Sequence, residues 1–240
     1  MTRQQLAHRR ARRRTELRRR RRRAVVSAVV PAIVVALLTA TLWVVLGNSD
    51  QGAGGLTAPE IPIGPGDRPK DVPIARAGLV ELRLPIDQTR VTAIAFHASD
   101  NPTSVELQPV GDLEYHTAPR NGRPGPERAA VDVGAPAGTL VYSPVDAIVV
   151  GVSDWVLRGK VQGYQVSLEP QNAGDVLVVL THIGLHAGSP PPKVGEAVRA
   201  GQTPLGEVLD LSGVVDQELS RYTADAGNHV AIEVVRTGLD

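Results

Sequence analysis

The chain has 240 residues, of which 26 are Lys or Arg, 25 are Asp or Glu and none is Cys. A chain of this length forms one or two domains. The absence of cysteine excludes disulfide bonds, thiolate metal sites and cysteine nucleophiles. The near-neutral total charge conceals two opposed regions: residues 1–23 hold twelve Arg and one acidic residue, whereas the rest holds 14 basic and 24 acidic residues.

An uncharged apolar segment follows the arginines directly, at residues 24–47. A helix of this length extends about 36 Å, which is enough to cross a hydrocarbon core of about 30 Å. Pro31 is tolerated better in a membrane helix than in a soluble one. Trp43 lies near the far end, where interfacial aromatic residues collect. The segment therefore predicts one transmembrane helix that acts as an uncleaved signal-anchor.

The arginine-rich tail predicts the orientation of the chain. Positive residues stay on the cytoplasmic side, so we expect a cell-membrane protein with a cytoplasmic N-terminus and an extracytoplasmic C-terminal part. Attraction to anionic lipid headgroups explains the tail more simply than nucleic-acid binding, which we do not expect. A cleaved signal peptide is the alternative, but its apolar region is usually about 7–15 residues long and ends at a small-x-small site, which is not clear here.

The remaining sequence divides into a linker and a β domain. Residues 48–77 are rich in Gly and Pro without a hydrophobic period, which is typical of an extended tether, and we expect the folded domain over residues 78–240. Alternating apolar segments between Gly and Pro predict a mainly β domain, an antiparallel sandwich or barrel. Only 214–222 favours a helix. The expected strands span 79–84, 91–96, 105–107, 139–142, 147–152, 164–168, 176–180 and 229–235.

Five motifs follow one another between residues 115 and 235. They are Asp132, an Ala-Pro-Ala-Gly-Thr turn at 135–139, a strand that ends in His182, a Gly-containing hairpin at 194–202 and a strand that begins His229-Val230-Ala231. In this order they resemble the lysostaphin-type (LytM-like) zinc metalloendopeptidases. The resemblance implies an antiparallel β-sandwich with a groove for peptidoglycan peptides. The hairpin alone also fits biotinyl and lipoyl carriers, but no acceptor Lys lies at the expected turn.

The same resemblance indicates a degenerate site that has lost its metal. It implies zinc ligands at three positions, which hold Arg128, Asp132 and Ala231 in this chain. A catalytic zinc needs three protein ligands and an open position, and neither Arg nor Ala supplies a ligand. His182 and His229 match the two histidines that the family uses beside the water and the oxyanion. We therefore expect no metal, and we regard these two histidines as vestigial rather than catalytic.

The expected groove follows from the period of a β-strand. His229, Ala231 and Glu233 share one face of the last strand, opposite the apolar residues between them. The candidate groove residues are Arg128, Asp132, His182, His229, Ala231 and Glu233. We expect the Arg128 guanidinium to pair with Asp132 in place of the zinc charge. This pair either belongs to a pocket for a peptide carboxylate or is a salt bridge without a ligand.

The remaining histidines of the predicted domain are His97, His116 and His186. If a metal is held, its ligands are Asp132, His182 and His229. His186 follows His182 by four residues, but Gly184 intervenes, so we expect an ordinary loop residue. His97 and His116 precede the matched motifs, and we expect them to be satisfied or exposed.

Three functions remain open at this point. The first is a membrane-anchored pseudoenzyme that binds peptidoglycan peptides or an envelope protein as a regulatory module. The alternative is an active zinc metalloendopeptidase with a rearranged ligand set, and the third is a purely structural envelope protein. Residues 78–110 have no counterpart in the matched motifs and are expected to form an additional edge for a partner.

Overall fold

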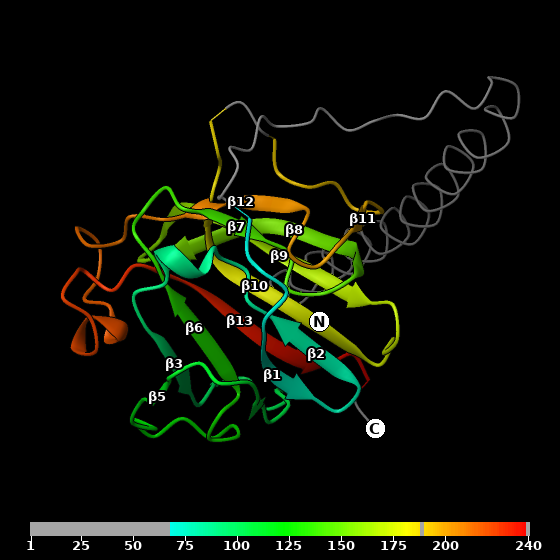
Figure 1. The fold of residues 1–240 in the computed structure, drawn as a ribbon, viewed down its shortest axis with the longest axis horizontal. Helices are drawn as coiled ribbons and strands as arrows, with labels where there is room; N and C mark the ends of the chain where they lie inside the picture. Colours follow the sequence, from blue (N-terminus) through cyan, green and yellow to red (C-terminus); the bar gives the residue numbers. More distant parts are fainter. Residues whose placement is uncertain (1–67, 188–189, 239–240) are drawn as a thin grey trace, which may run out of the picture. The chain divides into compact units, whose positions relative to one another are not determined.

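The computed structural model describes residues 68–187 and 190–238 (Figure 1). The predicted arginine-rich tail, transmembrane helix and most of the linker lie outside the described residues. Within the described ranges, no helix is long and apolar enough to span a membrane. The described part is mainly β, as predicted, and its only helical segments are two 3-10 turns, η1 (Gln88–Arg90) and η2 (Glu218–Arg221).

The strands form one large sheet and one small sheet. In chain order they are β1 (Pro73–Ala77), β2 (Val80–Arg83), β3 (Ile94–His97), β4 (Gln108–Pro109), β5 (His116–Thr117), β6 (Ala130–Gly134), β7 (Leu140–Tyr142), β8 (Ala147–Leu157), β9 (Lys160–Pro170), β10 (Val176–Gly184), β11 (Ala197–Val198), β12 (Pro204–Val208) and β13 (His229–Arg236). The large sheet has the order β11-β8-β9-β10-β13-β6-β3-β5, and β12 joins β10 to β7. The small sheet has the order β2-β1-β4.

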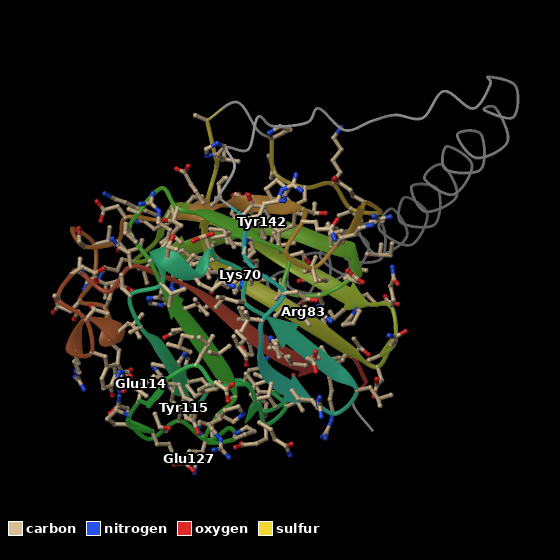
Figure 2. All side chains as sticks on the ribbon, in the orientation of Figure 1. Lys70, Arg83, Glu114, Tyr115, Glu127 and Tyr142 are labelled. Atoms are coloured by element: carbon tan, nitrogen blue, oxygen red, sulfur yellow. The ribbon has the colours of Figure 1, made fainter. Side chains whose placement is uncertain are left out.

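Alternation along the central strands separates a core face from an open face. On β13, Val230, Ile232 and Val234 are fully buried, and β10 and β6 present Val178, Leu180, Val131 and Val133 to the same core. Burial of such aliphatic faces is the main stabilising contribution to a β domain. Tyr142 on β7, the largest of the fully buried side chains, lies beside β12, whereas Glu127 lies at the opposite margin (Figure 2).

Several sequence-based boundaries need correction. The fold begins at least as early as Pro73, ahead of the predicted start at residue 78, because β1 pairs with both β2 and β4 and buries Ile74 and Ala75. The large sheet is mixed rather than antiparallel throughout, since β3 and β5 pair in parallel. Residues 105–107 form no strand, although Ser104 makes an isolated bridge to Val235. The helix expected at 214–222 is reduced to η2.

Candidate functional site

The open face of four central strands forms the floor of the site. The registers place two rows of residues side by side across β10, β13, β6 and β3: Thr181, Ala231, Asp132 and Ala95 in one row, and Val179, Glu233, Ala130 and His97 in the next. Ala231 and Ala95 alternate with larger residues in the first row, and Ala130 is the one alanine of the second, so short side chains leave space above parts of the floor. A cavity of about 370 Å³ lies over it, walled by Arg123 and by residues 215–218. We call this cavity the groove.

Asp132 is the polar centre of the groove. Its side chain is only 9% exposed, and its Oδ1 lies 3.2 Å from His97 Nε2 and 3.6 Å from His229 Nε2. The other ring nitrogen of each histidine faces a backbone carbonyl: His97 Nδ1 lies 2.8 Å from Ala98 O, and His229 Nδ1 lies 2.8 Å from Gly227 O. His97 is therefore held by hydrogen bonds at both ring nitrogens, whereas His229 is held at Nδ1 and only approaches the same carboxylate oxygen with Nε2.

His182 enters the groove through an unusual backbone. Its φ is +63°, and the pairing of β10 with β9 shifts register between Leu180 and Ile183. A positive φ is uncommon for a residue other than Gly and is strained, and a bulge of this kind re-aims the side chain. The ring centroid of His182 lies 4.4 Å from that of Trp155 and 4.6 Å from that of His229. The bulge thus packs this imidazole between a tryptophan and the second histidine.

Burial and charge set the protonation of these groups. Burial alone would lower the pKa of His97, but the charge of Asp132 and the hydrogen bonds to Asp132 and Ala98 raise it to about 9. Burial favours the neutral carboxyl of Asp132, yet the charges of His229 and His97 hold its pKa well below its usual range. Burial, followed by the charge of His229, lowers the pKa of His182 to about 3. At neutral pH the groove therefore holds an ionised Asp132, a protonated His97 and a neutral His182.

Most of the predicted groove residues meet in this cavity. Asp132, His182, His229, Ala231 and Glu233 all line it. The period-2 pattern predicts the shared face of His229, Ala231 and Glu233, and the motif resemblance implies Asp132 and His182. Glu233 accepts a hydrogen bond from the Ser104 hydroxyl.

Arg128 does not take the predicted position. Its Nε donates to Glu106 Oε1 at 3.2 Å, and its carbonyl accepts from the Leu107 amide at 2.7 Å. The expected ion pair with Asp132 is therefore wrong. The Glu106 carboxylate pairs with Arg128 instead, and His97 is the residue at hydrogen-bond distance from Asp132.

His97 lines the cavity although its sequence position predicts no place in the site. β3 pairs with β6 and brings His97 opposite Ala130, two residue pairs along the ladder from Asp132 and on the same face. The other two histidines have ordinary partners. His116 stacks on Tyr222 with ring centroids 4.3 Å apart, and His186 Nδ1 lies 2.9 Å from Glu207 Oε2.

The zinc site implied by the motifs does not fit these residues. Ala231 has no donor atom, and Arg128 is engaged with Glu106. Across residues 68–187 and 190–238, no three or more His, Asp or Glu side chains are arranged to hold a metal ion, which includes the alternative set Asp132, His182 and His229. The geometry instead offers a buried carboxylate that is hydrogen-bonded to His97, with His229 Nε2 at 3.6 Å and the neutral imidazole of His182 beside His229.

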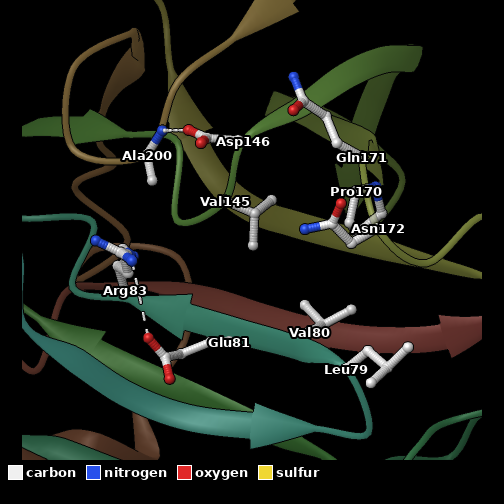
Figure 3. Close-up of a pocket in the computed structure, with 10 residues that line it drawn as sticks. All are labelled: Leu79, Val80, Glu81, Arg83, Val145, Asp146, Pro170, Gln171, Asn172 and Ala200. Carbon is white, nitrogen blue, oxygen red and sulfur yellow. Dashed lines mark hydrogen bonds and ion pairs between the residues drawn. The ribbon is translucent and has the colours of Figure 1, made fainter.

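A second cavity, of about 160 Å³, offers less chemistry (Figure 3). Its walls come from β2 and from the turns around Asp146 and Pro170. Asp146 Oδ1 accepts from the Ala200 amide at 2.8 Å, and Arg83 Nη2 lies 3.8 Å from Glu81 Oε1. The charged groups of this cavity are thus already engaged, and we do not assign it a function.

Comparison with known proteins finds similarity of structure only. No protein-family model matches the chain, and no curated protein matches it. Csd3 of Helicobacter pylori is similar with a TM-score of 0.36 and 17% identity over 65% of this chain and 31% of that one. Lysostaphin gives a TM-score of 0.35 and 21% identity over 54% and 45% of the two chains.

A mutant of the catalytic domain of EnpA, a prophage-encoded M23 protein from Enterococcus faecalis, gives a TM-score of 0.34 and 20% identity over 60% and 88% of the two chains. The chain thus spans less than half the length of Csd3 and of lysostaphin. The described domain is structurally similar to lysostaphin-type (M23) peptidase domains. This likeness concerns the fold and assigns no role to any residue of this chain.

Proposed function

We propose that this domain binds peptide in the groove without a catalytic metal, as a cell-wall or envelope-protein binding module rather than a peptidase. One observation carries the proposal: the groove persists, while two of the three positions that the motifs assign to zinc ligands offer no ligand. Ala231 presents a methyl group to the cavity, and Arg128 is paired with Glu106. A zinc peptidase needs three protein ligands around its metal.

The form of the groove supports a peptide as its ligand. The small side chains of Ala130 and Ala231 lower the floor, and polar groups of both kinds, donors and acceptors, surround it. Neutral His182 presents an imidazole that can both donate and accept, and Arg123 and Glu233 line the cavity with opposite charges. An extended peptide backbone needs such mixed partners. The choice of peptidoglycan peptides rests on the motif resemblance.

The membrane placement belongs to the same proposal. An uncharged segment at 24–47 preceded by twelve arginines supports a single span, with the arginines in the cytoplasm at anionic lipid headgroups and the β domain outside. Such a protein would present the groove to the cell wall or to an envelope partner. Labelling of a cysteine introduced at exposed Ser212 by a membrane-impermeant reagent, in intact cells, tests this orientation. Labelling only after lysis would contradict it.

The first prediction concerns metal content. The full-length chain is loaded with zinc, freed of excess and measured by elemental mass spectrometry, and we expect a ratio of zinc to protein near zero. Purified peptidoglycan incubated with the same sample should release no new peptide ends. A ratio near one that is lost in Asp132→Ala, together with cleavage, would establish the rearranged zinc endopeptidase instead.

The second prediction concerns peptide binding. Ala231→Leu adds three carbon atoms to the floor of the groove and alters no charge. We expect it to weaken sedimentation of the protein with purified peptidoglycan at least about tenfold, since filling a ligand pocket removes both contacts and volume. Ala197→Leu is the matched control, because Ala197 is exposed on β11. Equal binding by both variants would show that the ligand does not bind in the groove.

A further inference from the structure

We infer that Arg123 makes the groove selective for a carboxylate: the open edge of its guanidinium binds one carboxylate group of the bound peptide. This contact rests on the proposed function and deepens it, because it names the chemical group by which the groove selects its peptide. Among the described residues that line the groove, Arg123 is the one Lys or Arg side chain.

The contacts of the Arg123 guanidinium leave one edge open. Its Nη1 donates to Ala98 O at 3.1 Å and lies 3.2 Å from His97 Nδ1. Within the described part of the chain, Nε makes no hydrogen bond, and Nη2 only approaches Glu218 Oε2 at 4.0 Å, beyond hydrogen-bond length. Nε and Nη2 lie along the same edge of the planar group and can donate in parallel to the two oxygens of a carboxylate. The open edge therefore offers the two-point geometry that arginine favours.

Backbone contacts fix the loop that carries Arg123. Arg120 Nε donates to Arg123 O at 2.8 Å, and Arg120 Nη2 donates to Gly125 O. The Gly125 amide donates to Ser99 O at 3.0 Å, which ties the loop to the segment after β3. Ser99 also lines the groove, and its hydroxyl accepts from the Asn101 amide, which leaves the hydroxyl proton free for a ligand. The wall is thus ordered before a ligand binds, which lowers the entropy cost of binding.

The acidic residues near Arg123 do not saturate it. Glu218 Oε1 accepts from Asn121 Nδ2 at 3.2 Å and lies 3.8 Å from Arg221 Nη1, so Glu218 is shared among three donors. Asp216 is exposed where it lines the groove. These negative charges favour a ligand group with a single charge, such as a carboxylate, over a doubly charged phosphate.

Arg123 replaces Arg128 as the arginine of the expected carboxylate pocket. Arg128 pairs with Glu106, and it does not line the groove. Arg123 lies five residues earlier in the chain, and its contact with Ala98 O holds the guanidinium at the wall of the cavity. Neither Asp132 nor a histidine takes part in the contact with the ligand.

Sedimentation with chemically modified peptidoglycan tests this contact. Purified peptidoglycan is used untreated and after its carboxyl groups have been converted to amides with carbodiimide and ammonia. We expect the full-length chain to bind the untreated form at least about tenfold more tightly, since amidation removes a charge-assisted, two-point contact. Arg123→Gln should bind both forms equally. Equal binding of both forms by the parent chain would overturn the inference, and the proposed function would stand if Ala231→Leu weakened the binding of both.

Arg221→Gln is the matched control, because it removes the same charge beside Glu218 from a side chain that is 64% exposed. This variant should keep the preference for untreated peptidoglycan. Both variants retain the arginines of residues 1–23, so the attraction of that tail to anionic groups is common to them. Loss of the preference in both variants would show a general effect of charge and would overturn the inference.

Glu218→Gln separates binding from folding. It removes the negative charge that competes for Arg123, so we expect it to tighten binding to untreated peptidoglycan by about two- to fivefold and to leave binding to the amidated form as it is. A poorly folded variant would not bind more tightly. Unchanged binding by Glu218→Gln would contradict the role of Arg123. A parent chain that sediments with neither form of peptidoglycan would refute the proposed function and this contact together.

Discussion

Ala231 lies at the centre of the groove floor, between Thr181 and Asp132 across the ladder and two residues from both His229 and Glu233. Because the register pairs Ala231 with Asp132 on one face, a longer side chain at position 231 would take up volume beside the carboxylate. The Ala231 methyl group leaves this volume open to the cavity. His97 of β3 and His229 of β13 are the histidines next to Asp132. Ala231 therefore contributes to the floor of the cavity and supplies no metal ligand.

We expect protonation of His97 to contribute to the pH dependence of the free energy of unfolding. Its pKa is raised from 6.5 to about 9 in the fold, so its stabilisation is complete below pH 6.5 and is lost as pH rises through 9. The loss is at most about 3–4 kcal/mol, at about 1.4 kcal/mol for each unit of pKa. We expect His97→Gln to flatten the decline of the free energy of unfolding between pH 6.5 and 9, measured by urea denaturation.

His182 provides the control for this pH profile. Its pKa is lowered in the fold to about 3, so its contribution is present above pH 6.5 and is lost as pH falls toward 3. His182→Gln should therefore flatten the acid side of the profile and leave the alkaline side as it is. An unchanged alkaline limb in His97→Gln would show that His97 is not protonated in the fold.

The residues of the site divide into those that local sequence reveals and those that it does not. Asp132, His182 and His229 could be predicted because each belongs to a motif of a few neighbouring residues. His97 could not, because its place depends on the register between β3 and β6, which brings together residues 35 positions apart in the sequence. The predicted pairing of Arg128 with Asp132 was wrong for the same reason. Its actual partner, Glu106, lies on a segment whose packing no local sequence pattern specifies.

Strand β12 packs closely against β9 and β10 at Gly206. Its φ is +151°, and a Cβ there would lie 2.5 Å from both Gly184 O and Ile183 Cγ2 and would overlap the Tyr164 hydroxyl. That hydroxyl donates to Leu205 O. The three strands β9, β10 and β12 meet so closely here, at a point that we call the crossing, that position 206 has no room for a side chain. This crossing supports the bulge that carries His182.

We expect Gly206→Ala to destabilise the domain by about 2–4 kcal/mol, because it combines overpacking with a backbone conformation that L-residues rarely adopt. Thermal unfolding measures the change. Gly213→Ala is the matched control, since nothing lies within 4 Å of a Cβ at that position, and it should stay within about 0.5 kcal/mol of the parent protein. A similar loss in both variants would mean that the crossing tolerates a methyl group.

The elements that sequence predicted well are the long ones with a clear period. The strands expected at 147–152, 164–168, 176–180 and 229–235 all occur, and β8 and β9 extend further because they pair with each other as a hairpin. Two-residue strands such as β4, β5 and β11 carry too few residues for any period. The helix expected at 214–222 fails because the segment buries little more than Gln217 and Leu219, too narrow a face to hold an α-helix.

At the scale of the whole domain, the segment ahead of the motifs is an integral part of the fold. β1 and β2 place Ile74, Ala75 and Leu82 in the same apolar cluster as the central strands, and β3 extends the sheet beyond β6. The motifs therefore predict the centre of the domain but not its margins. The transmembrane span and the arginine-rich tail stay predictions of the sequence, because they lie outside the described residues.

The place of β13 has a consequence for how the protein is made. Residues 229–236 form the strand between β10 and β6. Until this last segment has been synthesised and inserted, β10 and β6 are therefore unpaired on the sides that face each other. Non-local pairing of this kind slows folding and prolongs exposure of strand edges. His229 joins His97 and Asp132, which the pairing of β3 with β6 brings together, only at that late step. An incompletely synthesised chain therefore lacks the part of the groove floor that Ala231 and Glu233 provide.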